Sequence, residues 1–161
     1  MLNHKFVRHL LVFVAVFTLG TGIVLADPPP KAVSGTFQTQ SFSGDGCNSP
    51  IDLCSSGIAT GDLAGDVFVS ITTSVVNVGA DGVPFSDYTG TISITANNGT
   101  ISGTIAGSIN LLTGELNSTV NLTEGTKKYK KRTGTLSVNG VFDLATGAEF
   151  DNYAGTIQVN P

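Results

Sequence analysis

The sequence predicts an all-β protein in which eight antiparallel strands close into a barrel, with a sandwich of two packed sheets as the alternative. Apolar and polar residues alternate along most of the chain after residue 35, which is typical of strands with one buried face. Short turn sequences separate these runs, so neighbouring strands must pair as antiparallel hairpins. Glycine accounts for 20 of the 161 residues, only 12% are charged and tryptophan is absent. This composition excludes a helical bundle or coiled coil and disfavours an α/β nucleotide-binding fold.

The first 26 residues have the three parts of a secretory signal peptide. Lys5 and Arg8 form a basic start, residues 10–26 are mostly apolar, and the helix-breaking sequence Asp27-Pro28-Pro29-Pro30 follows. We expect cleavage after Ala26 and export of the remaining chain, so the predicted location is secreted or periplasmic. The alternative is an uncleaved membrane anchor, although glycines interrupt an apolar run that is already short for a span. After cleavage we expect no membrane span.

The exported chain is predicted to hold a Pro-rich, mobile linker at 27–34 and a single barrel domain at 35–161. The strands follow in order, each an alternating or β-branched run that ends at a turn sequence such as Ala80-Asp81-Gly82, Asn97-Asn98-Gly99, Leu112-Thr113-Gly114, Asn139-Gly140 or Ala145-Thr146-Gly147. We expect them at residues 35–42, 57–65, 67–78, 88–96, 100–110, 115–123, 133–143 and 153–159.

Residues 67–78 (VFVSITTSVVNV) are the richest in β-branched side chains, so we expect this strand to be the most buried. The predicted interior comprises one residue in two from the alternating runs. Its members are Phe68, Ile71, Ile92, Ile94, Ile105, Val120, Leu136, Val138, Phe142 and Ile157.

Cys47 and Cys54 are the only cysteines, and six residues separate them in a segment rich in glycine and proline. An even number of cysteines in an exported chain favours a disulfide between them. The alternative, a redox pair, usually requires the spacing C-x-x-C at the start of a helix, and neither condition is met here.

The loss of the signal segment restricts the chemistry that the protein can perform. His4 and His9 are the only histidines, so the exported domain has none. Ser-His-Asp and Cys-His catalytic systems are therefore excluded, as are zinc sites built on histidine. Removing Lys5 and Arg8 leaves six basic against twelve acidic residues, a net charge of −6, which disfavours nucleic-acid binding. We expect no metal and no cofactor.

Residues 125–157 carry a further pattern: Gly125-Thr126, Tyr129, Thr133-Gly134-Thr135-Leu136, Gly140, Phe142-Asp143, Thr146-Gly147, Tyr153 and Gly155-Thr156-Ile157. This pattern resembles bacterial secreted domains related to the allene oxide cyclase and dirigent barrels, and residues 57–65 are similar to the second strand of those barrels. The resemblance implies an eight-stranded antiparallel barrel with a central apolar cavity. In the plant relatives that cavity holds a lipid epoxide or a phenolic radical pair. No functional carboxylate of those proteins can be placed on this chain.

Carboxylates and tyrosines are the remaining candidates for chemistry. Asp62 and Asp66 would share one face of a strand about 13 Å apart, too far for a glycosidase-type carboxylate pair. Asp143, Glu149 and Asp151 follow or precede the predicted last turn, and we interpret them as solvated turn residues. Tyr88 and Tyr153 are expected in the core or at its rim. These residues therefore predict no catalytic group.

Three functions remain open from the sequence. The first is a secreted or periplasmic barrel that binds a small apolar ligand or serves structurally, without catalysis. The second is a cyclase- or dirigent-like enzyme that steers a reactive ligand in its cavity. The third is a surface adhesion or matrix module of sandwich form.

The basic residues are concentrated in one short segment. Five of the six in the exported domain fall within Lys127-Lys128-Tyr129-Lys130-Lys131-Arg132. One interpretation is protection of a strand edge or hairpin tip against pairing. The other is an anion-binding patch for a polysaccharide, lipid head groups or an acidic partner. If the segment is a strand with Tyr129 facing inward, the predicted anion-binding residues are Lys128, Lys130 and Arg132 on the outer face.

Overall fold

A computed structural model describes residues 29–159, and these form a closed barrel of eight antiparallel strands. The strands are β1 (Lys31–Phe42), β2 (Cys54–Ala59), β3 (Gly65–Val78), β4 (Pro84–Ala96), β5 (Gly99–Asn110), β6 (Glu115–Gly125), β7 (Arg132–Phe142) and β8 (Ala148–Val159). Each strand pairs with its neighbours in sequence, and β8 closes the barrel by pairing with β1. The predicted barrel is thereby confirmed, and the two-sheet sandwich is excluded. The predicted signal peptide, residues 1–26, lies outside the described residues.

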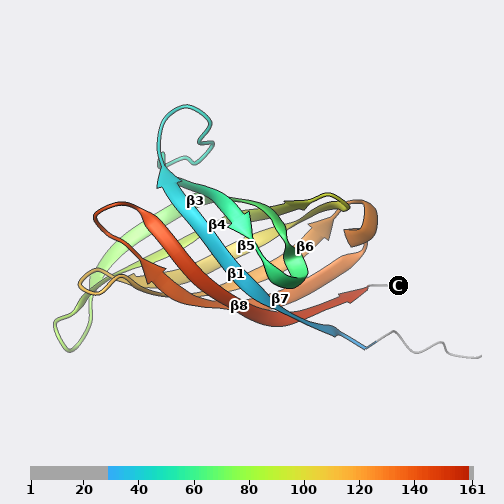
Figure 1. The fold of residues 1–161 in the computed structure, drawn as a ribbon. Helices are drawn as coiled ribbons and strands as arrows, with labels where there is room; N and C mark the ends of the chain where they lie inside the picture. Colours follow the sequence, from blue (N-terminus) through green and yellow to red (C-terminus); the bar gives the residue numbers. More distant parts are fainter. Residues whose placement is uncertain (1–28, 160–161) are drawn as a thin grey trace, which may run out of the picture.

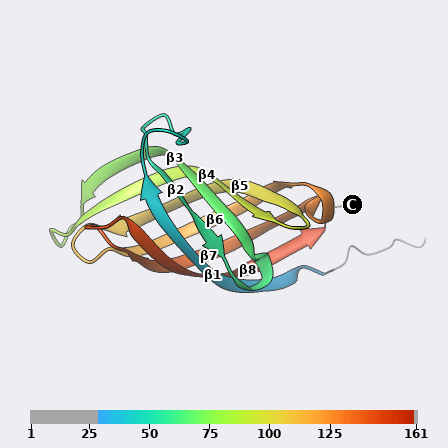
Figure 2. The same ribbon diagram turned by 45° about the horizontal axis from the view of Figure 1, so that its top comes forward.

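The barrel has two distinct ends (Figures 1 and 2). The four connections that follow the odd-numbered strands, residues 43–53, 79–83, 111–114 and 143–147, lie at one end, which we call the mouth end. Three connections, 60–64, 97–98 and 126–131, lie at the other end, which we call the closed end. The closed end also includes Lys31 and Val159, where the described strands β1 and β8 begin and end. Two of these contain short 3-10 helices, η1 (Gly61–Leu63) and η2 (Lys127–Tyr129). Within residues 29–159 no helix is long and apolar enough to cross a bilayer.

The interior is filled by alternate side chains, as the period-2 pattern predicts. Ile94, Ile101, Val120, Leu136 and Val138 are almost completely buried. Eight of the ten predicted core residues are buried, namely Ile71, Ile92, Ile94, Ile105, Val120, Leu136, Val138 and Ile157. Phe142 is half-buried at the mouth end.

The prediction that Phe68 lies in the interior is wrong. Val67, Val69 and Ile71 point into the barrel, so Phe68 points outward, where its ring lies 6.3 Å from that of Phe42. The alternation in this strand contains apolar residues on both faces, and the larger side chain is the outer one. Phe68 and Phe42 thus form a small apolar contact on the outside of the wall.

The expectation that residues 67–78 are the most buried strand is also wrong. Val75, Val76 and Val78 are 56%, 65% and 68% exposed. The pairing of β3 with β4 shifts between Ile71 and Thr73, so the strand carries a bulge there. Beyond the bulge, β3 and β4 continue toward the mouth end (Figure 1), where Ser74 and Ser86 line the cavity while the three valines face solvent. β-branched side chains here favour extended backbone without burial.

The first strand begins earlier than expected. β1 starts at Lys31, and its residues 31–34 pair with residues 154–157 of β8. The predicted linker therefore overlaps the strand that closes the barrel, and residues 27–28 of it lie outside the described residues. The second strand ends at Ala59, because Thr60 to Ala64 form the turn that contains η1.

Candidate functional site

A cavity of about 190 Å³ opens at the mouth end of the barrel. Its walls are mainly apolar and include Val69, Ile71, Ile105, Ile109, Leu116 and Phe142. The polar side chains in its wall are four serines, Tyr88 and Glu149. An apolar cavity of ~150 Å³ can hold one benzene molecule, so this space suits a single ring or a short alkyl chain.

Small residues leave this end of the barrel unfilled. After the bulge in β3, Ser74 takes the inward position, and its hydroxyl lies 2.8 Å from that of Ser86 on β4. Valine or isoleucine at these positions would continue the packing seen deeper in the barrel. The two serines instead keep the volume open and provide hydroxyl groups in the wall of the cavity.

A layer of polar side chains crosses the interior beneath the cavity, made of Thr39, Tyr88, Ser118, Glu149 and Asp151. Tyr88 extends from β4 to hydrogen-bond Ser118 on β6. Burial raises the pKa of the Tyr88 phenol, and the nearby charges of Glu149 and Asp151 raise it further. On β1, the Thr39 hydroxyl donates to Glu149 Oε2 over 3.1 Å.

Asp151 is the most unusual member of this polar layer. Its side chain is only 3% exposed, and neither carboxyl oxygen has a hydrogen-bond donor among the described residues. Burial raises the pKa of Asp151, and the adjacent Glu149 carboxylate raises it further. The two residues are two apart on β8 and therefore face the same way. A proton held by Asp151 can be shared with Glu149, which makes them a coupled carboxyl pair.

Two glycines make room for the polar layer. A Cβ on Gly107 would lie 2.2 Å from Ser118 Oγ, and one on Gly140 would lie 2.0 Å from Asp151 Oδ1. Both distances are far below a permitted contact, so the neighbouring strands can hold inward polar groups only because these two positions lack side chains.

Aromatic residues fill the barrel below the polar layer. The rings of Phe37 and Tyr153 stack with their centroids 4.7 Å apart. The Tyr153 hydroxyl donates to the Thr60 carbonyl over 2.7 Å and accepts from the Leu63 amide over 2.9 Å. Tyr129 of η2 is 3% exposed and packs against Gly125. Leu63, Tyr129 and Tyr153 therefore plug the closed end.

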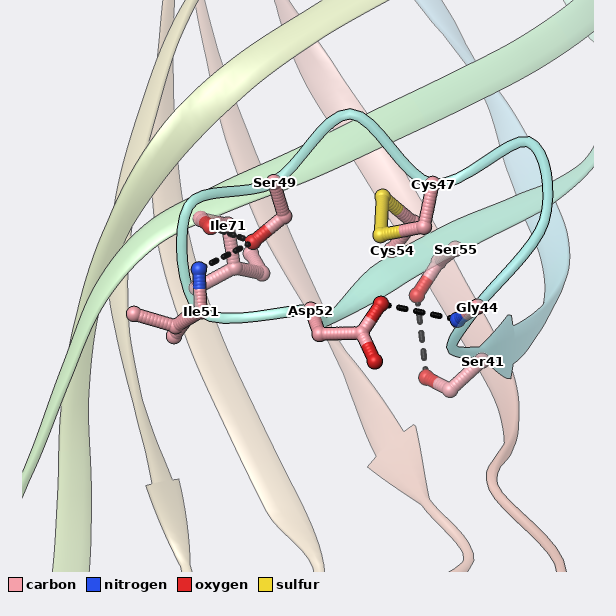
Figure 3. Close-up of a disulfide and its surroundings, with 9 residues drawn as sticks. All are labelled: Ser41, Gly44, Cys47, Ser49, Ile51, Asp52, Cys54, Ser55 and Ile71. Carbon is pink, nitrogen blue, oxygen red and sulfur yellow. Dashed lines mark hydrogen bonds between the residues drawn. A yellow bond between two sulfur atoms is a disulfide. The ribbon is translucent and has the colours of Figure 1, made fainter.

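The predicted disulfide between Cys47 and Cys54 is present and braces the loop of residues 43–53 (Figure 3). Asp52 accepts a hydrogen bond from the Gly44 amide over 2.7 Å, and Ser49 donates to the Ile71 carbonyl. The Ile71 amide in turn donates to the Leu53 carbonyl over 3.0 Å. β2 has only 6 residues against 14 in β3, so this loop stands beside β3 where β2 does not reach. Leu53 thereby becomes part of the cavity wall.

The segment 127–132 does not have the strand geometry that was expected. Lys127–Tyr129 form η2, and only Tyr129 is buried. All four lysines of the segment are exposed and Arg132 is half-buried, so two opposite faces are not formed. Lys128 Nζ lies 4.7 Å from the centre of the Tyr129 ring. Because the sheet is closed, this connection has no strand edge to protect.

The carboxylates fall into two groups. Asp62 lies in η1, where it binds Lys31 over 3.1 Å and the Ser34 amide over 3.1 Å, while Asp66 is exposed in β3. Asp143 caps the last turn through the amides of Ala145 and Thr146, as a solvated turn residue would. The same interpretation is wrong for Glu149 and Asp151, which point into the barrel.

Glu149 and Asp151 are the functional candidates that the sequence interpretation missed. The signal was present, because Asp151 has the same parity as the inward-facing Tyr153 and Ile157. Extending the alternation backwards along β8 would have placed both carboxylates inside. The described residues contain no group of three or more histidine, cysteine or acidic side chains arranged to hold a metal ion.

Charge is segregated along the barrel axis. All six basic residues among the described ones, Lys31 and the five of 127–132, lie at the closed end. Eight acidic residues lie in the mouth half: Asp45, Asp52, Asp81, Asp87, Glu115, Asp143, Glu149 and Asp151. Among the described residues, only Asp62, Asp66 and Glu124 are acidic at the closed end. The cavity therefore opens into the negative half of the molecule.

Comparison with known proteins adds no relative to this description. No family model matches the chain. No curated protein matches it either. No solved structure matches it.

Proposed function

We propose that the barrel binds a small, mainly apolar molecule in the cavity at its mouth end. The observation that carries this proposal is the cavity itself, which combines an apolar wall with a few polar groups at defined positions. Ligand sites of proteins commonly have this combination, in which apolar contacts supply affinity and polar groups fix orientation. The resemblance to the allene oxide cyclase and dirigent barrels points to the same use of the interior.

Titration with octan-1-ol, followed by amide NMR shifts of the exported protein, tests this proposal. We expect saturable shifts at residues that line the cavity. Ser86→Leu should abolish them by filling the space between β3 and β4, whereas Ser137→Leu, on the exposed face of β7, should leave them unchanged. Absence of saturable shifts in the wild-type protein would overturn the proposal.

A second candidate function, catalysis on a ligand held in the cavity, is favoured by the carboxyl pair. A carboxyl group that keeps its proton near neutral pH can act as a general acid, and its partner as a base. Native mass spectrometry of the exported protein would identify a bound species. Turnover of that species by the wild type, lost in Asp151→Asn and Glu149→Gln while binding persists, would support an enzyme; binding without turnover would support a carrier.

A further inference from the structure

We propose that the cavity selects apolar molecules that carry a positively charged amino group, and that this group binds at the Glu149 carboxylate. The inference rests on the proposed ligand-binding function and specifies the chemical class of the ligand. It is drawn from the cavity wall, the hydrogen bonding of the carboxyl pair and the distribution of charge.

The first observation is the composition of the cavity wall. Glu149 is the one carboxylate among the residues that line the cavity, and the lining contains no lysine or arginine. An ammonium group that enters the apolar space loses water, so it needs a compensating acceptor. Glu149 supplies a charged acceptor, and the hydroxyl oxygens of Ser74 and Ser86 supply neutral ones. An entering carboxylate would find no cationic partner in this lining.

The second observation is that the carboxyl pair has spare acceptor capacity. Among the described residues, Thr39 is the hydrogen-bond donor to Glu149, through Oε2 alone. Asp151 lies behind Glu149 and is not part of the cavity wall. A carboxylate has about four acceptor sites, so the Glu149 carboxylate, which does border the cavity, keeps unused ones. An ammonium group carries three donors and would satisfy several of them.

The third observation is the charge around the entrance. Asp52, Asp81, Asp143 and the other acidic residues of the mouth half have no basic residue near them among the described ones, because all of those lie at the closed end. Exposed charges act over about 8 Å at physiological salt, so they influence approach more than final affinity. They attract cations to the entrance and repel anions such as fatty acids.

Three probes of equal chain length test the inference: octylamine, octan-1-ol and octanoate at neutral pH. Octylamine is protonated there, as a lysine side chain is. We expect affinity in the order amine, alcohol, acid. Glu149→Gln should weaken the affinity for octylamine by about tenfold or more, the usual effect of losing a hydrogen bond to a charged group. The affinity of this variant for octan-1-ol should stay within about twofold of the wild-type value.

Asp143→Asn is the matched control, because it removes one charge from the mouth end without altering the cavity wall. We expect it to change octylamine binding by less than about twofold at physiological salt. Equal affinity for amine and alcohol, or an unchanged amine affinity in Glu149→Gln, would overturn the inference while the proposed function stands. If none of the three probes binds, the proposed function itself fails and the inference fails with it.

Discussion

The carboxyl group of Asp151 occupies the space that a side chain at Gly140 would need. A Cβ on Gly140 would lie 2.0 Å from Asp151 Oδ1 and 2.2 Å from the Phe150 carbonyl oxygen. The two residues are direct partners in the pairing of β7 with β8. The buried carboxyl group and the glycine opposite it therefore form one structural unit, and neither can change without affecting the other.

Gly140→Ala should destabilise the protein by about 1–3 kcal/mol, the usual effect of overfilling a packed interior. The clash includes backbone atoms, so a side-chain rotation at Asp151 cannot relieve it. Chemical denaturation measures the effect. Gly79→Ala is the control, because its nearest neighbour is the side chain of Asp81 in an exposed turn. Equal stability of the two variants would contradict this account.

The raised pKa of Asp151 predicts a pH-dependent stability. Above the ordinary aspartate pKa of 3.8, the unfolded chain releases a proton that the folded protein retains, so the stability from this group falls as pH rises. Asp151→Asn removes this dependence of the unfolding free energy on pH. The unfolding free energy of the variant, minus that of wild type, should therefore increase between about pH 4 and neutral pH.

Asp143→Asn should show the opposite sign. Hydrogen bonds from Thr146 and then from Ala145 lower the pKa of Asp143, so its contribution is present above the ordinary pKa and is lost as pH falls through the folded value. Urea unfolding measures both variants, from about pH 4 to neutral pH for Asp151→Asn and below about pH 4 for Asp143→Asn. Parallel curves for wild type and Asp151→Asn would contradict a buried, protonated carboxyl group.

The disulfide should stabilise the domain and hold Leu53 in the cavity wall. Replacing both cysteines, Cys47→Ser with Cys54→Ser, should cost about 2–3 kcal/mol, as expected for the closure of a short loop. Non-reducing peptide mapping of the purified protein should show the linked pair. Two free thiols on protein that was alkylated before any reduction would refute this expectation.

The two ends of the interior should respond differently to truncation. Leu136 is fully buried, so Leu136→Ala should cost about 2–5 kcal/mol. Phe142 is half-buried in the cavity wall, so Phe142→Ala should cost less than the 3–5 kcal/mol that is typical of a fully buried phenylalanine. Thermal or chemical unfolding compares the two variants. A larger loss for Phe142→Ala would show that the mouth end is packed and not open.

The basic segment remains a predicted anion-binding site. Replacing Lys128, Lys130 and Arg132 with serine should reduce retention on heparin and on anionic liposomes at low salt, because binding of this kind is electrostatic. The structure also exposes Lys127 and Lys131, so serine at these two positions should weaken retention as well. Equal retention of wild type and all variants would contradict an anion-binding role.

The strand order and most of the interior could be predicted from the sequence, because alternation and turn residues act locally. Leu136 and Val138, for example, are flanked by polar residues that leave one choice of face. The alternation fails where both faces are apolar, as at Phe68, because the pattern then does not say which face is buried and the larger side chain here is the outer one. It fails again at Val75 to Val78, where β-branched residues continue beyond the closed interior.

The candidate site could be predicted only in part. The disulfide followed from its sequence context, and the resemblance pointed to a cavity. From the sequence, Glu149 and Asp151 are predicted to face solvent, because charged residues beside a turn are usually solvated. Their burial depends on Gly140 and on the small residues across the barrel, which are neighbours in space and not in sequence. Such a non-local arrangement cannot be read from one strand.

Closure of the sheet limits how another polypeptide can bind to this protein. Within residues 29–159 every strand has a partner on both sides, but β2 pairs with β3 only as far as Ser70, so residues 72–78 of β3 have a strand partner on the β4 side alone. Recognition by strand addition, which many domains use to capture extended peptides, is therefore confined to this short stretch of β3 unless a seam of the barrel first separates. Elsewhere a protein partner must be recognised through the side chains of the wall or the connecting loops, where single substitutions can change specificity without disturbing the sheet.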